Sequence, residues 1–252
     1  MRRLYTLLLT LLLLPAVSAV AQEQRMYLLR QSGEVIFSLP VSEVDSVTFA
    51  TSDGDKSCVV NGHSFIDLGL PSGTLWASCN VGAESDTEDG DFFPWGEPKP
   101  NKKSTERTAK WHKVTYPYDV LAAEDDAATA QWGAPCCMPT KADVVELLNT
   151  DNTRCTWTDD YIGSGVKGYI VESVRNGNKV FFSASGIYYN GRQMGQGTYC
   201  MYWTSSPYAE PGMTAYVDEG AWKLTFVDTY QNFTAETWGF RSDASSVRAV
   251  VH

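Results

Sequence analysis

Basic residues are scarce in this chain of 252 residues, which has 20 lysines and arginines against 30 aspartates and glutamates and a net charge of −10. A chain this acidic is poorly suited to binding nucleic acid or anionic lipid through bulk electrostatics, so nucleic acid is not expected among its partners. Hydrophobic residues make up 43% of the sequence, which indicates a packed core and excludes wholesale disorder. Repeats with a period of roughly 20–50 residues are missing, which argues against a propeller or a solenoid.

Long apolar runs are absent after the N-terminus. Arg2 and Arg3 precede an apolar run from Leu4 to Leu14, and Ala19-Val20-Ala21 supplies the small residues of an A-x-A cleavage site. The run is shorter than the roughly 20 residues that span a bilayer, so it predicts a secretory signal peptide over residues 1–21 rather than a membrane anchor. The mature chain is expected to be exported, with no transmembrane segment after cleavage.

Histidine is rare, and the cysteines lack the spacing of a metal site. No C-x-x-C motif occurs, and the cysteines are not interleaved with His63, His112 or His252, so a zinc site is not expected. An exported chain meets an oxidising compartment, which permits disulfides, but six cysteines allow about 15 pairings and the sequence does not choose among them. The disulfide candidates are Cys58, Cys79, Cys136, Cys137, Cys155 and Cys200.

The mature chain divides into a small β module with a linker, residues 22–55, and a main domain, residues 56–252. In the module, residues 26–30 and 35–37 are expected to form a hairpin, with a third short strand at residues 46–49. Three short strands bury little apolar surface, so this module is expected to need support from something larger.

Two helices are expected early in the main domain. The first is an Ala-rich segment, residues 121–132, and the second covers residues 141–149, with Thr140 as its N-cap and Asp143 at N3. Asn-Gly dipeptides predict hairpin turns at residues 61–62 and 176–177, and further strands are expected at residues 199–205, 222–227 and 246–251. Two helices followed by many strands indicate the α+β class.

A set of motifs follows in order along residues 58–252. They are Asp67-Leu-Gly-Leu-Pro-Ser-Gly-Thr-Leu-Trp-Ala-Ser-Cys-Asn-Val-Gly-Ala83, Gly90-Asp-Phe-Phe-Pro-Trp-Gly-Glu97, Asp126-Ala-Ala-Thr-Ala-Gln-Trp-Gly133, Met138-Pro-Thr140, Asn176-Gly-Asn178, Tyr202-Trp-Thr-Ser-Ser206 and Ser246-Val-Arg248. In this order they resemble the major paralogous domain family, which is named after Fibrobacter succinogenes and is abundant in Bacteroidota. One departure is Cys136-Cys137, which stands where relatives usually carry Trp-Arg.

The resemblance implies a C-type lectin-like fold, related to that of formylglycine-generating enzymes, with two helices, a twisted antiparallel sheet and long loops. Those enzymes use a cysteine pair near the C-terminus as a copper thiolate site, but the last cysteine here is Cys200 and no position matches that pair. The family is mainly known as domains of unassigned biochemical role, so the resemblance indicates the fold more than the activity.

Enzymatic alternatives rest on isolated residues. A Cys137–His112 pair could supply a nucleophile and a base, although no histidine is near the two adjacent cysteines in sequence, which favours two separate structural thiols. Carboxylates for glycoside hydrolysis could come from Asp159-Asp160 or Asp218-Glu219, but adjacent acids are usually solvated loop charges. No catalytic residue is therefore assigned.

Calcium is the one cofactor that the composition suggests. An oxygen-rich stretch around Gly90 suits a hard cation, but it lacks EF-hand spacing, and a solvated loop is the favoured interpretation. Glu97-Pro98 lacks the following Asn of sugar-binding lectins, so no cofactor is assigned. The calcium candidates are Asp86, Glu88, Asp89 and Asp91.

Aromatic residues in the second half of the chain are the best candidates for ligand binding, because aromatic faces stack on sugars and dominate protein interfaces. The candidates are Tyr188, Tyr189, Arg192, Tyr208, Trp222 and Trp238, of which Tyr189 and Trp222 are expected to be exposed. The tryptophans inside the family motifs are expected in the core: Trp76, Trp95, Trp132 and Trp203.

The sequence thus predicts an exported, noncatalytic binding or adhesion protein of a bacterial envelope, in the periplasm, at the outer-membrane surface or outside the cell. Its expected partner is a glycan or an envelope protein. One alternative is a structural component of a surface complex, docked through the β module by strand addition. The second alternative is an enzyme on a lectin-like scaffold.

Overall fold

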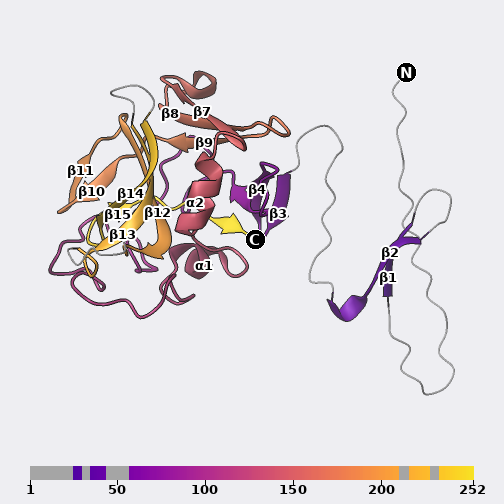
Figure 1. The fold of residues 1–252 in the computed structure, drawn as a ribbon, viewed down its shortest axis with the longest axis horizontal. Coiled ribbons are helices and arrows are strands. Elements are labelled where there is room, and N and C mark those ends of the chain that lie inside the picture. The colour runs from indigo at the N-terminus through magenta and orange to yellow at the C-terminus, as the bar shows by residue number, and fades with distance from the viewer. Residues whose placement is uncertain (1–24, 30–34, 44–56, 210–215, 228–232) are drawn as a thin grey trace, which may run out of the picture. The chain divides into compact units, whose positions relative to one another are not determined.

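The computed structural model describes residues 25–29, 35–43, 57–209, 216–227 and 233–252. The chain separates into two compact units, residues 1–48 and residues 49–252. The described part is mostly β, with two short helices and several antiparallel sheets (Figure 1).

The described residues of the first unit form a β-hairpin. Strand β1 (Arg25–Leu29) pairs antiparallel with β2 (Val35–Pro40), and a 3₁₀ turn, η1 (Val41–Glu43), follows. This confirms the hairpin expected from the sequence. The third strand expected at residues 46–49 lies outside the described residues.

The two ends of the second unit share a sheet. Strands β3 (Ser57–Val60), β4 (His63–Asp67) and β5 (Leu75–Ala77) pair in sequence, and β16 (Val250–Val251) pairs with β5. The strand expected over residues 246–251 is therefore limited to its last two residues. Residues 247–249 are irregular, yet two of their carbonyls are paired, because Ala77 N donates to Ala249 O and Val81 N donates to Val247 O.

Three further antiparallel sheets are found among the described residues of this unit. The first contains β7 (Thr153–Thr158), β8 (Gly168–Ser173) and β9 (Lys179–Ser183). The second contains β12 (Tyr199–Pro207), β13 (Gly220–Val227) and β14 (Phe233–Phe240). The third has the order β11 (Arg192–Met194), β10 (Ile187–Tyr189), β15 (Ala244–Ser245) and β6 (Phe93–Pro94).

Both Asn-Gly turns form as expected. Asn61 and Gly62 have φ angles of 50° and 84°, the left-handed conformation that joins β3 tightly to β4. Gly177 has a φ of 76° in the turn between β8 and β9.

The helices differ in how well the sequence predicted them. Helix α2 (Lys141–Leu148) begins at a capping box, in which Thr140 and Asp143 satisfy each other's backbone N–H groups, as expected. Helix α1 (Ala127–Trp132) is half the predicted length. Residues 121–126 are not helical, so the expected start at Leu121 is wrong, and Asp126 serves instead as N-cap by accepting from Thr129 N at 2.8 Å.

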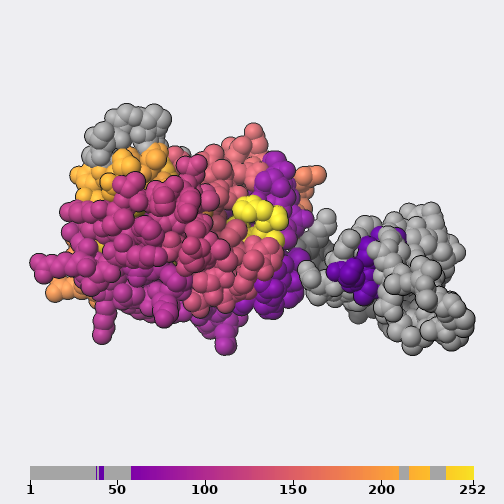
Figure 2. Space-filling model, turned by 90° about the horizontal axis from the view of Figure 1, so that it is seen from below, coloured from indigo at the N-terminus to yellow at the C-terminus, as the bar shows by residue number. Residues whose placement is uncertain are grey.

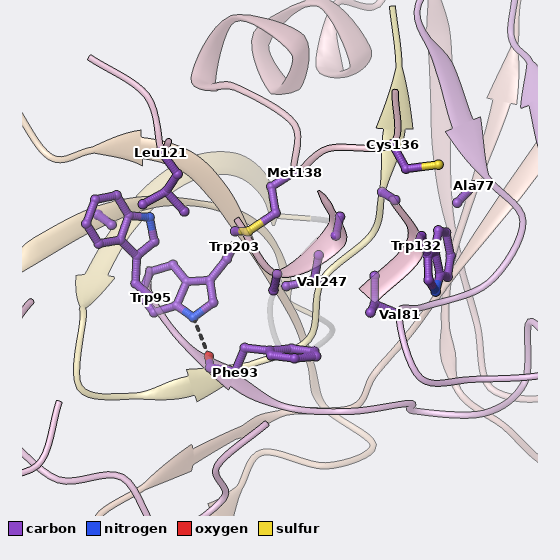
Figure 3. Packing of buried hydrophobic residues seen from close by; sticks show 14 of the residues in the cluster. Ala77, Val81, Phe93, Trp95, Leu121, Trp132, Cys136, Met138, Trp203 and Val247 are labelled. Atoms are coloured by element: carbon purple, nitrogen blue, oxygen red, sulfur yellow. Dashed lines mark hydrogen bonds between the residues drawn. The ribbon is translucent and has the colours of Figure 1, made fainter. Parts of the chain in front are cut away.

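Two hydrophobic clusters form the interior. The first contains Trp95, Trp132 and Trp203, and the Trp203 indole donates to Phe93 O at 2.9 Å (Figure 3). The second is built around Trp76 and the inner faces of β8, β9, β12 and β13. All four tryptophans of the family-like motifs are buried, which confirms their expected place in the core.

Candidate functional site

Five aromatic side chains gather on the sheet formed by β12, β13 and β14, and we call them the aromatic cluster. The Tyr208 ring lies 5.2 Å from both the Trp222 and the Trp238 rings, centroid to centroid. Tyr216 stacks on Trp238 at 5.0 Å and 24°, and Phe240 meets Trp238 edge-on at 5.5 Å. Three of the six aromatic-site candidates, as we call the six residues proposed from the sequence for ligand binding, are thus brought together: Tyr208, Trp222 and Trp238.

Strand register explains the assembly of the aromatic cluster. Trp222 and Trp238 are directly opposite each other in the pairing of β13 with β14. Trp238 and Phe240 are two residues apart on β14, and side chains with this spacing share a face of a strand. Gly220 makes room, since a Cβ there would lie 3.1 Å from both the Trp238 ring and Tyr208 Cβ.

The aromatic cluster has a buried side and an exposed side. Tyr208 and Trp222 are buried, Trp238 and Phe240 are half-buried, and Tyr216 is 46% exposed. The expectation that Trp222 is exposed is therefore wrong. Its ring is covered from α2, where the Lys141 ammonium lies 3.3 Å from the ring centroid.

The exposed Tyr216 belongs to a fixed turn. Its carbonyl accepts hydrogen bonds from Glu219 N at 3.0 Å and Gly220 N at 2.8 Å, and its φ of 66° is left-handed. The buried guanidinium of Arg241 donates to Val217 O at 3.1 Å and to Gly220 O at 2.8 Å. Burial lowers the pKa of Arg241 to about 10, which still leaves it charged at neutral pH.

A broad surface groove lies beside α2, with a volume of about 1140 Å³. Its apolar lining includes Pro71, Val120 and Val145, and its polar lining includes Asn149 and Ser206. Lys141 also lines it, so the groove and the aromatic cluster meet at this side chain.

The other three aromatic-site candidates lie on the β10–β11 hairpin. Tyr189 is 41% exposed, as expected, and is opposite the exposed Arg192. Tyr188 is half-buried and packs edge-on against Phe92 at 4.9 Å. The six candidates therefore form two groups, on different sheets.

The four calcium candidates are engaged separately. Asp86 accepts from the Tyr161 hydroxyl at 3.0 Å, Glu88 from Glu84 N at 2.9 Å, and Asp89 from the Gln196 amide at 3.0 Å. A Cβ at Gly82 would lie 2.6 Å from the Asp91 carboxylate. Across the described ranges, no three histidine, cysteine or acidic side chains are placed to hold a metal ion.

All six cysteines are described as free thiols, with no disulfide among them. Cys136 is buried in the first hydrophobic cluster, whereas Cys137 packs against the second. Burial raises the pKa of Cys155 to about 11 and that of Cys137 to about 12, the latter with help from Asp126 and Asp143.

The histidine beside Cys137 is not the one considered from the sequence. His112 is buried, with Glu106 at 3.8 Å, whereas Cys137 Sγ lies 3.8 Å from Nδ1 of His252. Of the acids considered for hydrolysis, Asp159 is exposed and pairs with Lys167 at 3.0 Å.

Tyr216 and Phe240 are the members of the aromatic cluster that sequence reasoning missed. Alternation along residues 233–240 would have placed Phe240 beside Trp238. No local signal identifies Tyr216, because its position depends on a turn held by Arg241 from a later segment.

No protein-family profile, curated protein or solved structure matches the chain. Within the described residues, no helix has the length and apolar character needed to cross a membrane.

Proposed function

We propose that this protein is an exported binding protein of a bacterial envelope that recognises glycan, without catalysis at that site, through the exposed side of the aromatic cluster and the adjoining groove. The observation that carries the proposal is the stack of Tyr216 on Trp238, backed by the buried Tyr208 and Trp222. A rigid aromatic face offers contact area at a low entropic cost, and sugar rings present the apolar C–H faces that stack on it.

The groove supplies the complementary chemistry. Sugars need hydrogen-bond partners beside an apolar face, and the groove lining mixes Val120 and Val145 with Asn149, Asn152 and Ser206. The net charge of −10 favours neutral over acidic polysaccharides, since like charges repel at an interface.

We further propose that the second unit is a C-type lectin-like domain of the major paralogous domain type. The ordered motifs of residues 58–252 support this, as do two helices combined with antiparallel sheets and long irregular loops. The N-terminal hairpin is then an appended module, and a role for it in docking an envelope partner remains the alternative function.

The test is binding of residues 22–252 to a glycan and polysaccharide array in calcium-containing buffer. We expect a saturable signal for a neutral glycan, reduced about two- to ten-fold in Tyr216→Ala, because one aromatic stacking contact is worth roughly 0.5–1.5 kcal/mol. Tyr189→Ala removes an exposed tyrosine from the other group of candidates and is expected to bind as the wild type does.

Two results would overturn the proposal. A folded wild-type protein that binds nothing on the array excludes glycan recognition for the ligands tested and points to a protein partner. A signal lost in Tyr189→Ala but kept in Tyr216→Ala moves the site to the β10–β11 hairpin. Circular dichroism of each variant shows that the comparison is between folded proteins.

A further inference from the structure

Three chemically complementary side chains meet beside the start of α2, and none of them is an aromatic-cluster or groove-lining residue. Cys137 Sγ lies 3.8 Å from Nδ1 of His252, and Nε2 of the same ring lies 3.1 Å and 3.2 Å from the two carboxylate oxygens of Asp143. A thiol, an imidazole and a carboxylate therefore lie in series, with the imidazole in the middle. We call these residues the thiol triad.

The fold holds the thiol and the imidazole side by side through the backbone. Cys137 N donates to Val250 O at 3.0 Å, and Val250 N donates to Cys137 O at 2.8 Å. This bridge sets the last residues of the chain alongside the segment that leads into α2, which places His252 next to Cys137. The thiol can also donate to Val250 O at 3.8 Å, so this carbonyl is an alternative acceptor to the imidazole.

The carboxylate is held independently of the imidazole. Asp143 Oδ2 accepts from Thr140 N and Thr140 Oγ1, both at 2.7 Å, within the capping box of α2. Thr74 Oγ1 adds a contact of 3.5 Å to Oδ1. Asp143 is therefore fixed in one orientation, and its two oxygens act as acceptors.

The hydrogen bonds determine which imidazole nitrogen carries the proton. Because Asp143 accepts, Nε2 of His252 donates to it, and a neutral ring then has its lone pair on Nδ1. That lone pair faces Cys137 Sγ. A nucleophile next to a base that a carboxylate orients is the arrangement that activates thiols and hydroxyls in acyl transfer.

We propose that Cys137 is a nucleophilic thiol that accepts an acyl group from a small activated ester, with His252 as its base and Asp143 as a positioning residue. In the acylation step, Sγ bonds to the acyl carbon and the S–H proton passes to Nδ1 of His252. The ester C–O bond breaks, and the alcohol leaves with the proton from His252. The product is an S-acyl Cys137, which water can cleave by the reverse proton path.

The surroundings make the base necessary for reactivity. Burial, together with Asp126 from the start of α1 and Asp143 from α2, raises the pKa of Cys137 to about 12, so little thiolate exists at neutral pH without a base. The His252 side chain is 48% exposed and Cys137 is half-buried, so the imidazole contacts solvent and the thiol is partly accessible. The yellow C-terminal end of the chain lies at the surface of the second unit (Figure 2).

The test is single-turnover acylation of residues 22–252 by p-nitrophenyl acetate, with peptide mass mapping to locate the acetyl group. The protein carries no affinity tag next to His252, so that the contacts of its imidazole are kept. We expect Cys137 to be acetylated faster than any other cysteine. His252→Gln should lower this rate at pH 7.5 by about 100-fold.

Matched variants distinguish base-assisted acylation of Cys137 from the acylation expected of any partly exposed thiol. Cys155→Ser removes another half-buried thiol and should leave the acylation rate of Cys137 unchanged. Glycan binding by Cys137→Ser should equal that of the wild type, so failure of one proposal does not affect the other. Acylation of Cys137 no faster than that of Cys155, or a rate unchanged in His252→Gln, would overturn the thiol triad.

Discussion

Buried charged side chains determine much of this structure at the scale of single residues. Arg248 is fully buried, and its guanidinium donates to Ala77 O, Phe181 O and the Asn80 side chain at 2.8–3.0 Å. One side chain thus satisfies acceptors from segments far apart in sequence, which regular strands do not reach. The irregular residues 247–249 can be buried because partners of this kind are present.

Lys223 differs from Arg248, because burial of its ammonium destabilises the charged form. It is 3% exposed, lies 3.7 Å from Asp243, and its pKa is lowered to about 8 by burial. Between pH 8 and about 10.5 the unfolded chain holds a proton that the folded chain releases, so the free energy of unfolding should rise with pH. Relative to Lys223→Met, we expect a rise on the order of 3 kcal/mol across this window.

Urea unfolding of both proteins from pH 7.5 to 10.5 measures this difference. Comparing the wild type with Lys223→Met cancels tyrosine ionisation, which acts on both proteins alike. Lys99→Met, which removes an exposed ammonium, serves as the control and should follow the wild type. Parallel curves for the wild type and Lys223→Met would show that the folded protein keeps Lys223 charged.

At the scale of elements, one side chain connects a hairpin to a helix. The Asn61 amide donates to Trp132 O at 2.8 Å and to Ala134 O at 3.0 Å, carbonyls at the C-terminal end of α1. Asn61→Asp keeps the shape of the side chain but replaces the donor with a negative charge beside carbonyl oxygens. We expect a loss of about 1–3 kcal/mol in the free energy of unfolding, measured in urea.

The chain offers a matched control for this prediction. Asn190 also precedes a glycine in a tight hairpin and also has a left-handed φ, of 48°. Asn190→Asp tests the cost of aspartate in that conformation, and we expect a change within about 0.5 kcal/mol. Equal losses in the two variants would mean that the turn, and not the capping of α1, determines the effect.

The elements that the sequence predicted correctly are those with local causes. The Asn61-Gly62 turn and the Thr140 capping box depend on residues within a few positions of each other. The predicted start of α1 was wrong because tertiary contacts override the helix preference of the Ala-rich segment. Leu121 N donates to Ser205 O, and Ala122 N to the Tyr116 hydroxyl, which hold residues 121–122 outside the helix.

The same distinction applies to the sites. The sequence identified Tyr208, Trp222 and Trp238 as binding candidates. Which of these side chains is buried and which is partly exposed depends on Lys141 and on strand pairing, and no local pattern reveals either. The thiol triad was missed for a similar reason. Its base, His252, is far from Cys137 in sequence and reaches it through the backbone bridge at Val250.

At the scale of the whole molecule, the second unit is held together by packing and hydrogen bonds. Its two hydrophobic clusters bury large side chains from nearly every sheet, and its six cysteines are free thiols. A domain of nearly 200 residues buries enough apolar surface to fold without covalent links. The proposed export to an oxidising compartment would permit disulfides, but this fold does not require them.

We therefore expect the purified mature chain to have the same stability with and without reductant. Thermal unfolding in dithiothreitol should change Tm by less than about 2 °C, whereas loss of a native disulfide costs about 2–5 kcal/mol and lowers Tm by roughly 5–15 °C. Thiol titration of the denatured, unreduced protein should find all six cysteines. Four titratable thiols together with a marked drop of Tm in dithiothreitol would contradict the free-thiol state. Mapping of the bridged cysteines would then show whether Cys137 is one of them. A disulfide at Cys137 would leave the thiol triad without its nucleophile.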